Sequence, residues 1–263
     1  MNNLDADFIA LVDDCLDNGS LRKGRNGDAT SVFGRMIRHD MRDGFPLITT
    51  RRVSYKGVFG ELAGFLEGAT TEARFAELGC PYWKHNAFPN GELGPIYGAQ
   101  WRDFNGVDQL ETLINGLHTN PYGRRHVLTT WNPADLPLMC LPPCHLLAQF
   151  FRGRDGSLSC SVYMRSVDLC LGLPSDLVLY GLLLALVAKE VGAWPKDLVF
   201  FLGDAHVYEN HEELWVSQRV RRIIPTYNGR LDLDDSTTIF EFLPEQAVIR
   251  DYKCHDTIKY PLN

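Results

Sequence analysis

The segment around Cys144 is the part of this chain best suited to do chemistry. Pro142 and Pro143 precede the cysteine, and each proline fixes φ and lacks a backbone N–H, so we expect the thiol on a stiff, non-helical lead-in. A thiolate is a good nucleophile, and Arg165 on a predicted strand could lower the pKa of the thiol. Most lone cysteines are core residues. The interpretation of Cys144 as a nucleophile therefore depends on the residues that accompany it.

Two acidic residues could work with such a nucleophile. Asp176 opens an almost wholly apolar helix, which the sequence predicts from about Asp176 to Val191. Glu61 borders the apolar stripe of a helix predicted from about Tyr55 to Glu67. Most glutamates so placed reach solvent, and most aspartates that open a helix are solvated N-caps. In a half-dry site, however, Glu61 could order water and relay protons.

Basic residues that could hold an anion lie in two places. Arg124 and Arg125 directly precede a strand predicted over 126–131, and Arg25 lies in a glycine-rich turn. Adjacent arginines usually stay solvated, but paired with an anion they form a fork-shaped clamp. The net charge of −7 argues against general nucleic-acid binding, so an anionic ligand would need arginines gathered locally.

Composition is that of a globular protein with a sizeable core. The 263 residues are 45% hydrophobic and 22% charged. The longest apolar run is shorter than the ~20 residues of a transmembrane helix, so we expect no membrane partner, and the acidic N-terminus does not resemble a signal peptide. The seven cysteines show no paired metal-ligand spacing, so we expect no metal. Their apolar settings favour reduced thiols and hence a cytoplasmic protein.

Hydrophobic spacing predicts the elements that would position these residues. With no repeats or linkers in the sequence, we expect one domain over residues 1–263, of class α+β, with a large mixed β-sheet packed by helices. Besides the two helices above, the pattern predicts helices over about 4–18, 110–117 and 208–221 and strands over 31–41, 147–151, 157–168 and 198–207. The chain from Pro225 onward is expected to form short strands and turns.

An aromatic segment from Cys80 to Asp103 is too apolar for a free loop. It contains Trp83 and Tyr97 and several glycines and prolines. Such a segment could wall a pocket or cap the core, and its composition slightly favours the cap.

Several longer motifs, in a common order, give the chain a resemblance to the thymidylate synthase family from end to end. They are DGFPL at 43–47, LGPIYGAQWR at 93–102, RR at 124–125, PCH at 143–145, RSVD at 165–168, LGLP at 171–174, GDAHVY at 203–208 and HDTIK at 255–259. The resemblance implies a thymidylate synthase-like fold and a homodimer. It also implies an enzyme that uses 5,10-methylenetetrahydrofolate to alkylate C5 of a pyrimidine nucleoside monophosphate.

Carried over by motif, the resemblance assigns a role to each candidate residue. Cys144 would add to C6 of the base, Glu61 would order the water that relays protons, and Tyr97 would assist proton removal at C5. The residues expected to bind the nucleotide are Arg25, Arg124, Arg125, His145, Arg165, Ser166, Asp176, His206 and Tyr208, with Arg124 and Arg125 donated by the partner subunit. Those expected to meet the folate are Arg51, Trp83, Asp168, Gly172 and Asn263. The turn that carries Arg25 is one residue shorter than in the family.

The chemistry explains these residue types. C5 of a pyrimidine is a poor nucleophile until a group adds to C6 and makes the ring enamine-like, and a thiolate adds and leaves easily. Loss of the C5 proton and departure of tetrahydrofolate then leave an exocyclic methylene. Hydride completes it to a methyl group, whereas water completes it to a hydroxymethyl group.

The clearest departure from the family is Asp176, which stands where a thymidylate synthase has asparagine. Asparagine suits uracil, because its oxygen accepts from N3–H and its amide donates to O4. Cytosine reverses this pattern. A protonated aspartic acid could donate to N3 and accept from N4–H, or an aspartate could pair with cytosine protonated at N3. Deoxycytidylate hydroxymethylases also carry aspartate here, so the chain resembles the cytidylate-specific branch, with dCMP the expected substrate by analogy.

Three further departures bear on the folate side and on the product. Arg51 replaces the usual lysine and keeps the charge, Ser175 replaces a bulky aromatic residue, and the chain ends about one residue short in polar Asn263. A short, polar tail would close the site less well against water, which favours 5-hydroxymethyl-dCMP. Retained Trp83 instead favours hydride transfer and 5-methyl-dCMP.

Three alternatives to the hydroxymethylase hypothesis remain open. They are a dCMP 5-methyltransferase, an orthodox dUMP thymidylate synthase, and a non-catalytic nucleotide- or RNA-binding relative. Because Cys144, Glu61, Tyr97 and Trp83 are all present, the sequence favours an enzyme that needs no nucleic-acid partner. We expect it to act in the cytoplasm, which for a phage-encoded chain would be that of the host.

Overall fold

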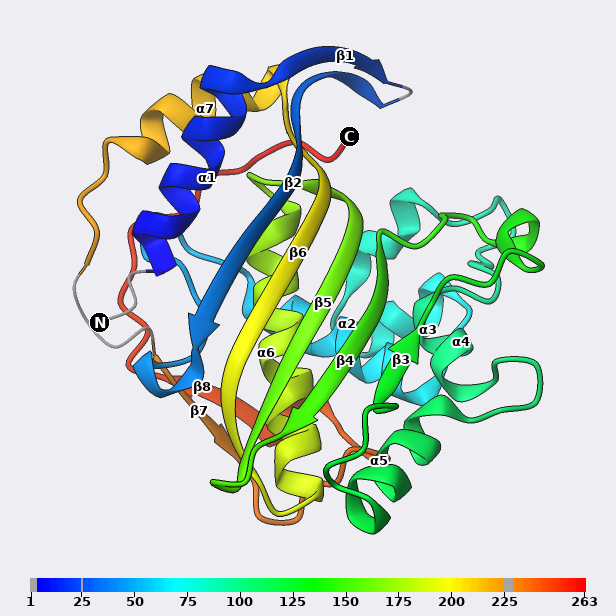
Figure 1. The fold of residues 1–263 in the computed structure, drawn as a ribbon. Helices are drawn as coiled ribbons and strands as arrows, with labels where there is room; N and C mark the ends of the chain where they lie inside the picture. The colour runs from blue at the N-terminus through cyan, green and yellow to red at the C-terminus, as the bar shows by residue number, and fades with distance from the viewer. Residues whose placement is uncertain (1–3, 25, 225–228) are drawn as a thin grey trace.

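A six-stranded mixed sheet forms the centre of the protein (Figure 1). The computed structural model describes residues 4–24, 26–224 and 229–263. The strand order is β1-β2-β6-β5-β4-β3; β5 and β6 run parallel, and the other neighbouring pairs are antiparallel. The strands are β1 (Ser20–Gly24), β2 (Gly27–Asp40), β3 (Val127–Thr129), β4 (His145–Arg152), β5 (Ser157–Asp168) and β6 (Trp194–Tyr208). A second, antiparallel sheet pairs β7 (Arg230–Leu233) with β8 (Ala247–Arg250).

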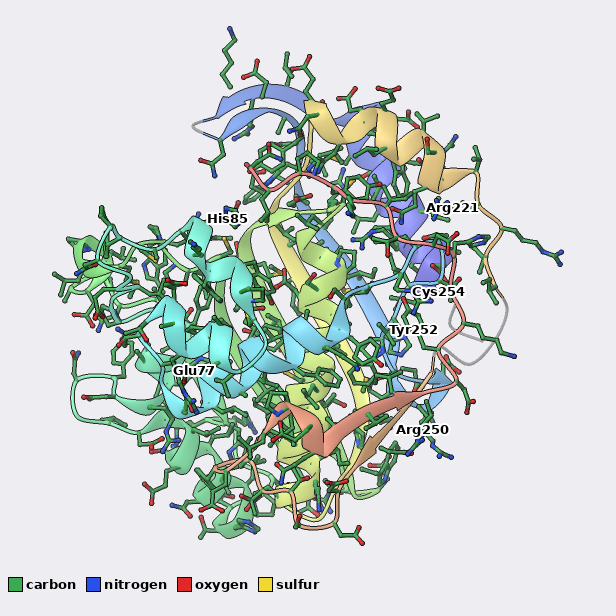
Figure 2. All side chains as sticks on the ribbon, turned by 180° about the vertical axis from the view of Figure 1, so that it is seen from behind. Glu77, His85, Arg221, Arg250, Tyr252 and Cys254 are labelled. Atoms are coloured by element: carbon green, nitrogen blue, oxygen red, sulfur yellow. The ribbon has the colours of Figure 1, made fainter. Side chains whose placement is uncertain are left out.

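Helices cover one face of the large sheet. Helices α2 (Tyr55–Glu67) and α6 (Gly172–Glu190) lie behind the sheet in the view of Figure 1 and in front of it in the reverse view of Figure 2. Helices α1 (Leu4–Asn18) and α7 (Glu209–Arg219) pack beside β2 and β6. The shorter helices are α3 (Glu72–Glu77), α4 (Tyr97–Arg102) and α5 (Gln109–Thr119). The predicted α+β class, with one domain and a large mixed sheet packed by helices, is confirmed.

Helix α6 is largely buried and connects the two parallel strands. The prediction that it starts near Asp176 is wrong, because the helix begins at Gly172. Pro174 falls in the first turn, where a missing N–H removes no intrahelical hydrogen bond, so the proline does not delay the start. The helix is long and apolar enough to cross a membrane, but 78% of that stretch is buried inside the protein.

No helix covers the opposite face of the sheet in Figure 1. Apolar side chains are exposed on this face. The strand register places Met36, Phe201, Tyr163 and Leu147 side by side across β2, β6, β5 and β4. Their exposed fractions are 57%, 45%, 37% and 37%. The inward-facing neighbours on the same strands are buried, as alternation along a strand requires. The sheet therefore has one face packed in the core and a second apolar face without cover in this single chain.

Other differences from the predicted elements have local causes. Strand β1 was not expected, because all five of its side chains are exposed and show no alternation. Strand β6 starts at Trp194, earlier than predicted, because its first residues pair with Ser157 and Leu158 of β5. Helices α3 and α4 are only six residues long, too short for a clear apolar period. All seven cysteines lie in the described residues and are unpaired, in agreement with the expectation of reduced thiols.

Candidate active site

A cavity of about 490 Å³ opens where the carboxyl ends of β5 and β6 meet the first turn of α6. Predicted site residues make up much of its lining: Glu61, Trp83, Tyr97, Cys144, His145, Ser166, Asp168, Gly172, Asp176, Tyr208 and Asn263. The aromatic segment walls this cavity, although composition slightly favoured a core cap. Residues far apart in the sequence thus converge on a single hollow of the size usual for small-molecule sites.

Cys144 is held at the cavity wall by two other predicted residues. The Arg165 guanidinium donates hydrogen bonds of 2.7 and 2.9 Å to the carbonyls of Pro143 and Pro142, which fixes the proline lead-in. The backbone N–H of Cys144 donates to the Tyr97 hydroxyl at 2.8 Å. We expected a lowered thiol pKa, but the direction is the reverse. Burial raises the pKa of Cys144, the Arg165 charge opposes this, and the Asp176 charge adds to it.

Glu61 reaches the cavity from α2 and is held by two aromatic side chains. The Tyr82 hydroxyl donates to one carboxylate oxygen at 2.8 Å, and the Trp83 indole N–H donates to the other at 3.0 Å. Burial raises the pKa of Glu61 to about 7, and the two hydrogen bonds oppose that rise. A carboxyl group with such a pKa can exchange protons with water at neutral pH, which is what general acid–base catalysis requires.

Tyr97 begins helix α4 in a strained backbone conformation. Its φ of 25° lies in a region that costs a non-glycine residue about 1–3 kcal/mol, so the surrounding packing must hold it there. The next residue is Gly98, where a Cβ would lie 2.1 Å from the carbonyl oxygen of Phe65. This close approach of α4 to α2 lets the Tyr97 ring stack on Phe65 at 5.0 Å. Burial raises the pKa of Tyr97 well above its ordinary value, so the hydroxyl stays protonated.

Asp176 and His145 face each other inside the cavity. His145 Nε2 lies 3.8 Å from Asp176 Oδ1, and His145 Nδ1 lies 2.8 Å from the Tyr180 hydroxyl. Burial lowers the pKa of His145 to about 3, so the imidazole is neutral. Burial also raises the pKa of Asp176 well above its ordinary value, and the charges of Glu61 and Asp168 add to the rise. These effects favour the protonated carboxylic acid form of Asp176 over the carboxylate.

The residues predicted to bind phosphate and sugar are only partly gathered here. Ser166 and Tyr208 line the cavity, and the His206 ring packs edge-on against Tyr208 at 5.0 Å. Arg124 and Arg125 are exposed and do not line the cavity of their own chain. Arg25 lies outside the described residues.

Most of the predicted folate residues line the cavity. Trp83, Asp168, Gly172 and Asn263 do so, and Asp168 accepts hydrogen bonds from the backbone N–H groups of Cys170 and Leu171. Arg51 does not line it. Its guanidinium is buried, donates to the Cys170 carbonyl at 2.6 Å and lies 5.4 Å from the centre of the Tyr260 ring.

Several residues at the cavity were not expected from the sequence. Tyr82 and Tyr180 hold Glu61 and His145, as described above. Asn210 and Asn263 exchange side-chain hydrogen bonds of 2.8 and 3.3 Å, and His211 Nε2 lies 2.9 Å from the Pro261 carbonyl. Tyr180 is the residue that spacing could have revealed, because it lies one helical turn after Asp176.

One cluster at the cavity edge offers metal-ligand types. Donor atoms of Asp168, Cys170 and His211 lie within 4.8 Å of one another. Burial lowers the pKa of His211 and the contact with Asp168 raises it, with a net rise, while burial raises the pKa of Cys170. The contact with Asp168 favours the charged form of His211, the raised pKa of Cys170 favours its thiol form, and the Arg51 guanidinium lies nearby, all of which disfavour a cation. The cluster is better described as a histidine–carboxylate contact beside a buried thiol.

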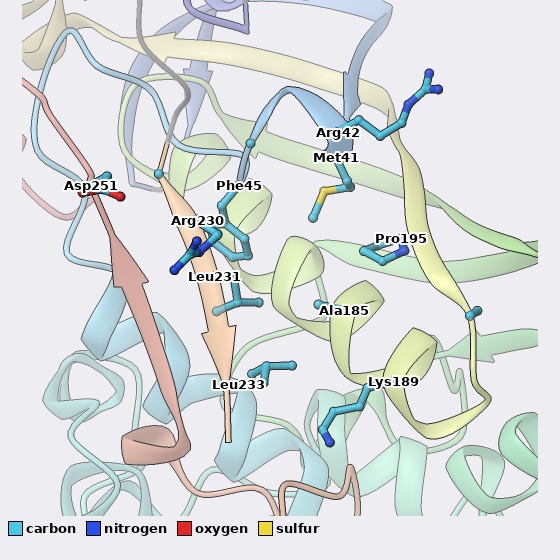
Figure 3. A pocket seen from close by; sticks show the side chains of 13 residues that line it. Met41, Arg42, Phe45, Ala185, Lys189, Pro195, Arg230, Leu231, Leu233 and Asp251 are labelled. Atoms are coloured by element: carbon cyan, nitrogen blue, oxygen red, sulfur yellow. The ribbon is translucent and has the colours of Figure 1, made fainter. Parts of the chain in front are cut away.

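A larger cavity of about 720 Å³ lies away from these residues, between α6, β7 and the turn that follows β2 (Figure 3). Its basic side chains already have partners. Arg42 pairs with Asp40, Arg230 pairs with Asp232, and Lys189 donates to the Asp235 carbonyl. Its lining in the described chain contains one acidic residue, the exposed Asp251, and no cysteine, serine or histidine. The smaller cavity gathers Cys144, Glu61 and Asp176 and is therefore the candidate active site.

Comparison with known protein families gives one match. The family model described as thymidylate synthase matches residues 6–263. The match spans every residue that lines the smaller cavity.

Proposed function

Because this chain belongs to the thymidylate synthase family of one-carbon transferases, we propose that it alkylates C5 of a cytidine monophosphate, with dCMP the expected substrate. The family establishes an enzyme that transfers a one-carbon unit to C5 of a nucleotide. The choice of cytosine and the nature of the product are our proposals, and each is supported by particular residues of the cavity.

The observation that carries the cytosine proposal is the environment of Asp176. The side chain is 17% exposed, and its pKa is raised by burial and by the nearby charges of Glu61 and Asp168. A protonated carboxyl group offers one donor and one acceptor, which match N3 and N4–H of cytosine. Uracil would meet a donor opposite N3–H and an acceptor opposite O4. Each such unpaired buried group costs about 1–3 kcal/mol.

Cys144 supplies the nucleophile in this proposal. Its sulfur forms a bond to C6 of the base, and electron density moves to C5, which becomes nucleophilic. Because burial raises the pKa of the thiol, its proton has to pass to a base when the sulfur attacks, and Glu61, with a pKa of about 7, can take it up through water. Arg165, whose charge lowers that pKa, favours the thiolate at this step. Elimination of the same sulfur at the end of the reaction restores the free enzyme.

Glu61 and Tyr97 handle the remaining protons. The proton at C5 has to leave once the new carbon is attached, and Tyr97 lies beside Cys144 with its hydroxyl protonated. A phenol in this state can pass a proton along through a water molecule. With a pKa of about 7, Glu61 can order that water as a carboxylate and release or take up its proton.

The cavity fits 5,10-methylenetetrahydrofolate, which would supply the one-carbon unit when bound. Trp83 gives a flat apolar wall, and Asp168 keeps acceptor capacity for ring N–H groups. Leu171 and Leu262 add apolar lining beside Asn263. Arg51 is a nearby cation whose Nε has no hydrogen-bond partner among the described residues.

The proposed product is 5-hydroxymethyl-dCMP, with 5-methyl-dCMP as the alternative. The side-chain carboxamide of Asn263 lies at the cavity rim and is hydrogen-bonded to Asn210 of α7. The neighbouring Leu262 is 58% exposed. A polar rim of this kind can retain a water molecule near the substrate. If Trp83 does more than stack on the folate, it favours hydride transfer and hence 5-methyl-dCMP. Mass analysis of the product decides between the two.

We also propose that a second copy of the chain covers the open sheet face. The apolar row Met36, Phe201, Tyr163 and Leu147 has no cover among the described residues, and the family resemblance supports another subunit as its partner. Arg124 and Arg125 are exposed and away from their own cavity, so they remain free to serve the cavity of the partner.

Tritium release from C5-tritiated nucleotides tests the substrate. With methylenetetrahydrofolate present, we expect release from dCMP and little from dUMP, and Asp176→Asn should move the preference towards dUMP by about tenfold or more. Ser175→Ala, which leaves the carboxyl group in place, is the matched control. Preferential turnover of dUMP by the natural chain would refute the cytosine proposal. Nucleotide binding without any C5 exchange would support a binding-only relative.

A further inference from the structure

Tyr180, His145 and Asp176 form a line of polar groups inside the protein. Tyr180 follows Asp176 by four residues on α6, so the two side chains share one face of the helix. The His145 ring lies between them. Its Nδ1 is 2.8 Å from the Tyr180 hydroxyl, and its Nε2 is 3.8 Å from Asp176 Oδ1.

Aromatic packing fixes the imidazole in this position. The His145 ring lies 5.2 Å from the Tyr180 ring at 88° and 4.4 Å from the Tyr97 ring. Tyr180 is 1% exposed and His145 is 5% exposed. Within the described part of the chain, the Tyr180 hydroxyl makes its one hydrogen bond to His145 Nδ1. The Tyr180 hydroxyl is therefore held by His145, whose Nε2 faces Asp176 in the cavity.

This arrangement decides where the hydrogens lie. The hydroxyl hydrogen of Tyr180 has a single acceptor, His145 Nδ1, and would be unpaired if Nδ1 carried a hydrogen of its own. The neutral imidazole therefore carries its hydrogen on Nε2, which faces Asp176 Oδ1. Because the Nε2–H of His145 faces Oδ1 of Asp176, a hydrogen on Oδ1 would face another hydrogen, so Oδ1 stays unprotonated. The hydrogen of a protonated Asp176 then belongs on Oδ2.

We propose that Tyr180 is a positioning residue for substrate choice: its hydroxyl holds His145 as the Nε2–H tautomer, which keeps Asp176 Oδ1 an acceptor and leaves Oδ2 to donate. The inference rests on the proposed action on cytosine. An acceptor beside a donor matches N4–H and N3 of that base. The opposite tautomer would draw the carboxyl hydrogen onto Oδ1 and reverse the pattern. Specificity thus depends on a phenol that the cavity does not expose.

Nitrogen-15 spectra of the histidine side chains test the tautomer in the ligand-free protein. His145→Gln identifies the His145 signals among the eight histidines. We expect an unprotonated Nδ1 in the natural chain, and a loss of this preference in Tyr180→Phe, which keeps the ring and removes the hydroxyl. An unchanged Nε2–H tautomer in Tyr180→Phe would overturn the inference.

Kinetics with both nucleotides test the consequence. We expect Tyr180→Phe to lower kcat/KM for dCMP about tenfold, the effect of losing about one hydrogen bond, and to change that for dUMP by less than about threefold. Tyr252→Phe is the matched control, because it removes a half-buried hydroxyl that bonds to backbone groups of Ile48, Arg51 and Val53, away from the cavity. The ratio of kcat/KM for dCMP to kcat/KM for dUMP should stay unchanged in Tyr252→Phe. Equal losses for the two nucleotides in Tyr180→Phe would overturn the inference.

The two experiments separate this inference from the proposed function. If the natural chain prefers dUMP, the cytosine proposal fails, and the nitrogen-15 spectra still decide whether Tyr180 sets the tautomer. If the natural chain prefers dCMP and Tyr180→Phe keeps that preference, the role of Tyr180 is refuted and the cytosine proposal stands.

Discussion

The Trp83 indole N–H donates a hydrogen bond of 3.0 Å to Glu61, so the residue that walls the folate side of the cavity also stabilises the charged form of the carboxylate. Tyr82 does the same at the other oxygen, at 2.8 Å. Burial raises the pKa of Glu61 by more than the two hydrogen bonds lower it, so the pKa is about 7. Under the proposed function, folate binding and proton handling would therefore share the Trp83 side chain.

Removing either hydrogen bond should raise the pKa of Glu61 further. If activity depends on ionised Glu61, kcat rises through about pH 7 in the natural chain. Trp83→Phe and Tyr82→Phe should each shift this rise upward by about half a unit to one unit, because each lost bond favours the ionised form. A pH–rate profile for each variant measures the shift. Trp83→Phe should also raise KM for the folate, and an unmoved profile in both variants would show that another group controls it.

Glu61 should also make stability fall as pH rises. Its pKa is about 7 in the folded state against an ordinary 4.5, so the folded protein binds this proton more tightly. The stabilisation is complete below about pH 4.5 and is lost as the pH rises through about 7. The free energy of unfolding of Glu61→Gln, minus that of the natural chain, should therefore be larger at pH 8 than at pH 5, by up to about 3 kcal/mol.

Thermal unfolding at the two pH values measures this difference. Glu77→Gln is the control, because Glu77 is 65% exposed on the helical side of the molecule (Figure 2). Its stability relative to the natural chain should be nearly the same at both pH values. If the stability of Glu61→Gln relative to the natural chain also changed little between pH 5 and pH 8, Glu61 would not be protonated in the folded state.

The hydrogen-bonded pair of Asn210 and Asn263 should control how the C-terminal tail lies over the cavity. Asn210→Ala and Asn263→Ala each break the pair, so each should raise KM for the folate several-fold and increase the share of hydroxymethyl product. Both changes break the Asn210–Asn263 pair, and Asn263→Ala also removes the 3.1 Å contact of its amide with His211 Nε2. The double variant should therefore lose little more than Asn263→Ala alone. Fully additive losses would show that the two residues act independently.

The open face of the sheet should be the contact between two subunits. Phe201 lies in the middle of the apolar row, so Phe201→Glu should shift the protein from dimer to monomer in sedimentation velocity experiments. Val220→Glu is the control, since Val220 is 78% exposed at the end of α7, off the sheet. A natural chain that sediments as a monomer would refute the proposal.

The sequence predicted the main elements well where an apolar period is strong. Helix α2 has the predicted bounds, and β5 matches its predicted range. The prediction failed where a local rule misled it, as for Pro174 in the first turn of α6, or where no pattern exists, as in β1. Short elements such as α4 depend on contacts with the rest of the fold and have little pattern of their own.

The candidate site was predicted mainly through motifs, and its electrostatics were not. Cys144, Glu61 and Asp176 line one cavity, as expected of a shared site. The raised pKa of Cys144 was missed, because the arginine was visible in the sequence and the burial was not. The position of Tyr180 one turn after Asp176 was visible in the sequence, but the contact of its hydroxyl with His145 of β4 was not.

The pairing of β2 with β6 sets the order in which the chain can fold as it is synthesised. Ala29 pairs with Tyr208, so the N-terminal hairpin has no neighbouring strand until most of the protein has left the ribosome. At about 5–20 residues per second, β2 waits roughly 10–30 s for β6. Throughout that interval one hydrogen-bonding edge of β2 is unpaired and available to other strands. Newly made chains are therefore most prone to aggregate before residue 208 emerges, and chaperones that bind exposed strands would act in this interval.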